Sequence, residues 1–127
     1  MNLSSLKDVF SINPGIESDQ LNDLEAQLNR KIPDEYRDLL QAANGFTLAN
    51  GLSMYPAEDV FERNETFEVS KYAPDYLAIG DNSGGRSVLI PFEGVGVYDV
   101  DQGVMDPDDM EKLAPSLTEW ISNGCVV

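Results

Sequence analysis

Carboxylates are the most numerous reactive groups in this chain. Its 127 residues include 23 acidic side chains, eight basic ones and no histidine, for a formal charge of −15 at pH 7. A surface with this charge repels nucleic acid and anionic membranes and attracts cationic partners. The sequence therefore predicts a basic protein as the partner, although acidity also serves simply to keep a small protein soluble. Two acidic clusters are the candidate contact residues: Glu58, Asp59, Glu62 and Glu65, and Asp99, Asp101, Asp106, Asp108, Asp109 and Glu111.

Closely spaced carboxylates also suggest a metal site, because Ca²⁺ takes several carboxylate oxygens. The spacing does not fit the calcium loop of an EF-hand. Counted from Asp99, the twelfth position is Met110, where that loop requires glutamate. Zinc sites draw on histidine and cysteine, and the chain has no histidine and one cysteine. We therefore predict no metal and no cofactor.

Catalysis has little support in the residue inventory. Nucleophilic catalysis lacks histidine as its usual base, and Cys125 lies near the C-terminus. Paired carboxylates can act as acid and base, but acidic residues are so frequent here that some pairs are expected by chance. The glycine-rich turn at residues 80–85 is followed by Arg86 and a strand, which favours a hairpin over a phosphate loop. Arg86 is expected to neutralise Asp81, and we predict no catalytic residues and no enzyme.

Length and composition favour one domain over residues 1–127. The hydrophobic content of 42% is ordinary for a folded protein, and no apolar run approaches the roughly 20 residues of a membrane helix. The N-terminus has neither a basic start nor an apolar signal core, and the single cysteine suits a reducing compartment. A cytoplasmic location and a monomer are the expectations.

Hydrophobic spacing predicts an α+β fold in which N-terminal helices and a C-terminal helix pack on a mainly antiparallel sheet of about 4–6 strands. Residues up to 15 are expected to be irregular or weakly helical. Helices are expected from residues 18–19 to 31, from 33 to a left-handed cap at Asn44-Gly45, and from 113 to 121. A short helix and loop should fill residues 57–73. Strands are expected at residues 46–48, 52–55, 76–79, 86–90, 96–99 and 104–105.

Three segments resemble, in order, the motifs of the SUKH superfamily (Smi/Knr type). They are IPDEYRDLL at residues 32–40 with Asn44-Gly45 after it, YAPDYLAIGD at 72–81 with Gly84-Gly85 after it, and LAPSLTEWI at 113–121. Leu117 stands where phenylalanine is commoner in that family. The resemblance implies an α+β fold and, in bacteria, an immunity protein that neutralises a cognate toxin. That toxin is often a nuclease of a polymorphic or contact-dependent system.

The same resemblance leaves an alternative open, because fungal relatives include a regulator of cell-wall assembly that acts as a scaffold. The resemblance implies no catalytic residues, and the toxin-binding surface varies among members of the family.

The expected mechanism is occlusion of a nuclease cleft. A nuclease holds phosphates with lysine and arginine, and an acidic face can occupy such a cleft in place of the phosphates. Tight binding further requires an apolar centre, for which five aromatic residues are candidates. These are Tyr55, Phe61, Phe67, Tyr72 and Phe92.

Overall fold

A computed structural model describes all 127 residues and confirms the α+β class. Seven strands, one more than the upper expectation, form a single antiparallel sheet in chain order. They are β1 (Val9–Pro14), β2 (Ala43–Leu48), β3 (Ser53–Met54), β4 (Tyr76–Asp81), β5 (Arg86–Pro91), β6 (Val97–Asp101) and β7 (Glu111–Ala114). The helices are α1 (Ser18–Leu28), α2 (Asp34–Ala42), α3 (Ala57–Thr66), α4 (Val69–Tyr72) and α5 (Leu117–Ser122), with a 3₁₀ turn η1 (Pro107–Asp109). No helix has the length and apolar character needed to cross a membrane.

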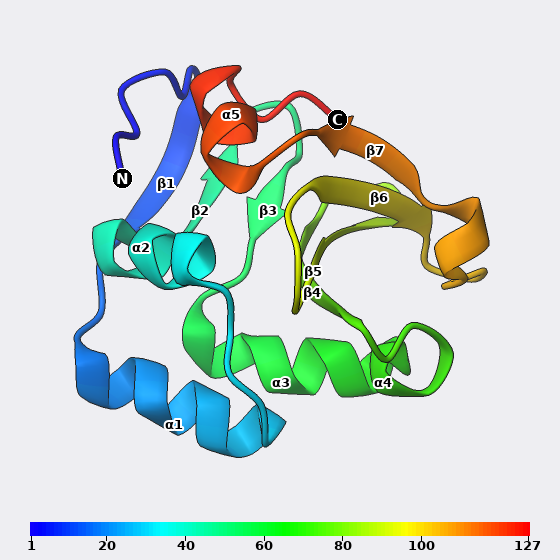
Figure 1. Cartoon of the computed structure of the whole chain (residues 1–127). Coiled ribbons are helices and arrows are strands. Elements are labelled where there is room, and N and C mark those ends of the chain that lie inside the picture. The colour runs from blue at the N-terminus through cyan, green and yellow to red at the C-terminus, as the bar shows by residue number, and fades with distance from the viewer.

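The helices are distributed around the sheet rather than stacked on one face (Figure 1). Helices α1 and α3 lie side by side below the strands, α4 continues from α3, and α5 lies near β7. A main core of 25 buried residues includes Trp120, Tyr36 and Phe46. In β4, Leu77 and Ile79 join this core while Ala78 joins a second cluster of six residues beneath α4. This alternation follows the two-residue period of a strand and places buried residues on both faces of β4.

Two carboxylates, those of Glu25 and Glu35, link the helices through hydrogen bonds. The Glu25 carboxylate on α1 accepts hydrogen bonds from the Ile32 N–H at 2.8 Å and from Arg37 on α2 at 2.7 Å. The Glu35 carboxylate on α2 accepts one from the Thr118 N–H in α5 at 2.8 Å. Segments far apart in the sequence are therefore joined by side-chain hydrogen bonds as well as by packing.

The structure corrects the sequence-based assignment at the N-terminus. Residues 9–14 form β1 and are not irregular or helical. All six residues of this edge strand are exposed, so no alternation of buried and exposed residues marks it in the sequence.

Other corrections concern the C-terminal third of the chain. The last strand is residues 111–114, whereas Val104 and Met105 lie in the turn before η1. The closing helix begins at Leu117, four residues later than expected, because Ser116 caps it by accepting the Glu119 N–H at 3.1 Å. Pro115 therefore lies outside the helix.

The Asn44-Gly45 pair does not cap α2. That helix ends at Ala42, and the next residue has the extended φ of −155° that starts β2. Gly45 does have a positive φ of 83°, but within the strand. A Cβ atom there would lie 2.7 Å from both the Met54 carbonyl oxygen and the Pro56 nitrogen. Glycine is required at this position by the close approach of the next chain segment.

Candidate partner-binding surface

Helix α3 presents the first acidic cluster as a stripe. Ala57, Val60 and Asn64 are buried against the rest of the molecule. On the opposite side the helical repeat brings three exposed side chains into line, and Asp59 is half-buried beside them. The exposed residues are Glu58, Glu62 and Glu65.

Two buried asparagines fix α3 in place. The Asn44 Oδ1 accepts the Ala57 N–H at 2.7 Å, and its Nδ2 donates to the Glu58 carboxylate at 3.0 Å. Near the other end, the Asn64 Oδ1 accepts the Ala78 N–H of β4 at 2.9 Å. The Asn64 Nδ2 donates to the carbonyl oxygens of Val60 and Ala78 at 2.8 and 2.9 Å. The acidic helix is thus bound to β2 and β4, a rigid support for the carboxylates it carries.

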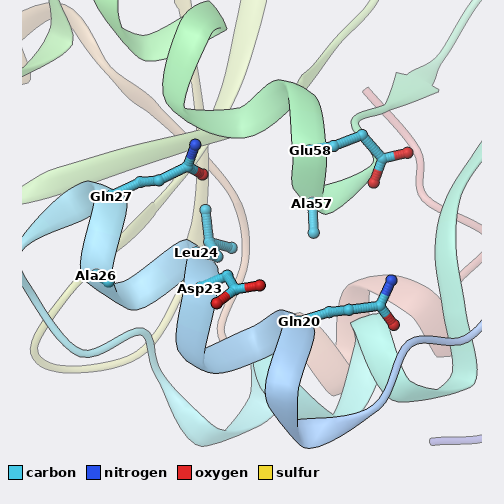
Figure 2. A pocket seen from close by; sticks show the side chains of 7 residues that line it. All are labelled: Gln20, Asp23, Leu24, Ala26, Gln27, Ala57 and Glu58. Atoms are coloured by element: carbon cyan, nitrogen blue, oxygen red, sulfur yellow. The ribbon is translucent and has the colours of Figure 1, made fainter.

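A groove of about 540 Å³ runs between α1 and α3. In Figure 2, the α1 side chains of Gln20, Asp23 and Gln27 line it from one side and Ala57 of α3 from the other, near Glu58. Leu24 lies between the two helices. The sequence analysis did not indicate that Asp23 and Glu58 line the same groove. No local pattern could have indicated this, because the pairing of α1 with α3 is a tertiary contact.

The second acidic cluster does not form one continuous surface, because Asp99 is only 4% exposed. Its carboxylate accepts the Arg86 Nε–H at 2.8 Å and a second guanidinium N–H at 3.1 Å. These hydrogen bonds raise the pKa of the Arg86 guanidinium above its ordinary value. The sequence predicts that Arg86 neutralises Asp81, and this prediction is wrong. In the structure Arg86 pairs with Asp99.

Asp81 instead accepts the hydroxyl of Tyr55 at 2.7 Å. Burial first, and then this hydrogen bond, raise the pKa of Tyr55. The phenol is therefore held in its neutral form beside the carboxylate.

The rest of the second cluster is exposed: Asp101, Asp106, Asp108, Asp109 and Glu111. Local hydrogen bonds order two of these side chains. The Asp101 carboxylate accepts the Gly103 N–H at 2.8 Å, and Asp106 accepts the Asp108 N–H at 2.9 Å. Both carboxylates keep further acceptor positions open to solvent.

A hollow of about 510 Å³ lies where the end of α3 and helix α4 meet the turn after β6. Thr66, Phe67, Glu68 and Tyr72 line one side, and residues 102–105 line the other. The fold therefore brings one end of the α3 stripe close to the start of the exposed second cluster. Of the five aromatic candidates, Tyr72 is the most exposed, at 53%.

Most carboxylates in the molecule have no basic partner. Three ion pairs are present, and they engage Glu25, Glu68 and Asp99 among the 23 acidic side chains. No group of three or more potential ligand side chains is arranged to hold a metal ion. The unpaired carboxylates leave a strongly negative surface that a cationic partner can neutralise.

Comparison with known proteins places this architecture in a family. The uncharacterized protein YnaB of Bacillus subtilis (strain 168) is 29% identical over 70 residues. That alignment covers 55% of this chain and 46% of YnaB, so the chain spans less than half the length of this relative. The model of the SMI1 / KNR4 family (SUKH-1) matches residues 15–123, from the turn after β1 to the end of α5. The chain belongs to the SMI1 / KNR4 family (SUKH-1).

Proposed function

We propose that this chain is an immunity protein that neutralises a cognate toxin by covering a basic, nucleic-acid-binding cleft with its acidic surface. One chain occludes one toxin domain, and no bond is made or broken. The family supports this role, since its members are often immunity proteins. The observation that carries the proposal is the α3 stripe, whose exposed carboxylates stand on a helix that Asn44 and Asn64 anchor to β2 and β4.

The α3 stripe is suited to this task because the helix that carries it is fixed to the sheet before the partner arrives, and Asn44 also orders the Glu58 carboxylate. A nuclease cleft holds phosphates with lysine and arginine, and carboxylates at fixed positions can engage the same groups. Their field accelerates encounter to about 10⁸ M⁻¹s⁻¹ at low salt, against about 10⁵–10⁶ M⁻¹s⁻¹ for uncharged surfaces. Asp99 is left out of the proposed contact surface because its carboxylate is already bound by Arg86.

The first test is protection in cells. The chain is co-expressed with a toxin domain encoded beside its gene, and survival, copurification and one-to-one stoichiometry are the expected results. Survival without a complex would contradict occlusion. The absence of any protected toxin would favour a regulatory scaffold instead.

The second test addresses the charge. The triple variant Glu58→Gln, Glu62→Gln, Glu65→Gln should slow association with the toxin by about tenfold or more at low salt, since steering is electrostatic. A control removes the same charge elsewhere, through Asp34→Asn, Asp38→Asn and Asp75→Asn, all at exposed positions outside both clusters. Equal slowing by both triples would show that net charge alone matters and that the α3 stripe has no special role.

A further inference from the structure

We propose that the hollow between α4 and the turn after β6 is the apolar centre of the interface and receives one aromatic or aliphatic side chain of a basic partner. This inference rests on the proposed function and names the chemistry of the contact. The partner segment has cationic residues on both sides of an apolar one.

Four of the eight residues that line the hollow are hydrophobic. Tyr72 is 53% exposed and Val104 is 50% exposed, so two large hydrophobic side chains are accessible to a partner at this one site. Phe67 and Met105 connect this surface to the smaller buried cluster around Val69. A volume of about 510 Å³ accommodates a bulky side chain. Aromatic residues bury about 150–250 Å² each. One partner ring inserted into the hollow would therefore slow dissociation of the complex.

The surroundings of the hollow are acidic. Glu68 lines it directly, and Asp101 and Asp106 flank the wall formed by residues 102–105. An apolar centre with a charged rim is the usual arrangement of a protein–protein interface. The negative rim selects lysine or arginine on the partner and disfavours an acidic segment.

Lys71 is the basic residue at this site. Its Nζ lies 3.8 Å from the Glu68 carboxylate and 5.1 Å from the centre of the Tyr72 ring. The Lys71 side chain is 68% exposed, so a partner cation can displace it at small cost. Its position demonstrates that the ring face and the carboxylate together accommodate a cation.

The groove between α1 and α3 is less suited to be the centre. Its lining is made of glutamines, carboxylates and small or leucine side chains, with no aromatic residue among them. The groove fits a role in steering and rim contacts. The two surfaces thus have different roles. Exposed charges at the α1–α3 groove control the association rate, and the apolar group buried in the hollow beside α4 controls the dissociation rate.

The test uses the full chain and three peptides, Ac-KKWKK-NH₂, Ac-KKAKK-NH₂ and Ac-EEWEE-NH₂, titrated into ¹⁵N-labelled protein. We expect amide shifts at residues 66–72 and 102–105 for the first peptide. The alanine peptide should bind about tenfold more weakly, a difference of about 1.4 kcal/mol, and the acidic one should not bind. Raising salt from about 50 to about 300 mM should weaken the binding of both basic peptides while preserving the ratio of their dissociation constants.

Two variants make the result specific. Tyr72→Ser should remove the advantage of tryptophan over alanine, while Phe10→Ser, which changes the 82% exposed aromatic residue on β1, should preserve it. Melting curves check that both variants remain folded. Equal binding of the tryptophan and alanine peptides, or tryptophan-dependent shifts confined to the α1–α3 groove, would overturn this proposal. Neither result affects protection of cells by the chain, which tests the proposed function separately.

Discussion

The amide of Asn44 bridges β2 and α3, with its Nδ2 3.0 Å from the carboxylate of Glu58. The same side chain accepts the Ala57 N–H through Oδ1, so it both caps the helix and orients the first carboxylate of the acidic stripe. A residue of the family motif therefore acts on the candidate binding surface from a buried position.

Replacing Asn44 tests this relationship. Asn44→Ala should lower the free energy of unfolding by about 1–2 kcal/mol, because the first turn of α3 loses its cap. Asn44→Asp should also destabilise, because it retains an acceptor for Ala57 but sets a second carboxylate against Glu58. Urea unfolding measures both effects. Asn22→Ala, at an exposed position on α1, is the control and should change stability by less than about 0.5 kcal/mol.

Arg86 should be essential to stability rather than to binding. Arg86→Met leaves the Asp99 carboxylate buried without its two donors, and we expect a loss of about 3 kcal/mol in urea unfolding. Arg86→Lys should recover only part of this, since a lysine cannot donate in the same fork geometry. The exposed Lys112→Met is the matched control. A loss equal to that of the control would contradict the structural role.

The hydroxyl of Tyr36 is buried without a hydrogen-bond partner. Burial also raises the pKa of this phenol, so it stays neutral across the physiological range. Tyr36→Phe removes an unsatisfied donor without changing the packing of the ring, and stability should rise by up to about 1 kcal/mol. Thermal and urea unfolding measure the change in stability. A loss of stability in Tyr36→Phe would show that the hydroxyl has a hydrogen-bond partner in solution.

Cys125 should be inert in the folded protein. Burial raises the pKa of its thiol from the ordinary 9.0 to about 12, so at pH 8 a thiol reagent should react only after unfolding. Because the folded-state pKa is the higher one, this contribution to stability is complete below pH 9 and is lost between about pH 9 and pH 12. Cys125→Ala should flatten the decline in stability between pH 9 and pH 10. Rapid labelling of the native thiol would contradict its burial.

Hydrophobic periodicity in the sequence was sufficient to predict the helices that bury one face. Leu21 and Leu24 fix α1, and Tyr36, Leu39 and Leu40 fix α2. The same reasoning missed β1, whose residues are all exposed. It also misplaced the last strand, because Val104 and Met105 form a turn whose backbone N–H groups bond to the Asp101 carbonyl oxygen.

The candidate surface was only partly foreseeable. Composition identified the acidic residues but could not separate Asp99 from Asp101, which lie two residues apart in β6. Their difference is set by the neighbouring strand, where Arg86 is opposite Asp101 yet reaches diagonally to Asp99. The grooves depend on which helices and turns meet, and those contacts are fixed by the whole fold.

The exposed strand β1 has a consequence for behaviour at high concentration. Open strand edges invite growth into fibrils, and this one carries hydrophobic side chains, including Phe10. Two shifts of pairing interrupt its regular spacing, and Pro14 has no N–H to donate to an incoming chain. At the far edge of the sheet, β7 carries the charged residues Glu111 and Lys112. Both edge strands, β1 and β7, are thus poor templates for the addition of a further strand. We therefore expect concentrated solutions of the protein to remain free of amyloid.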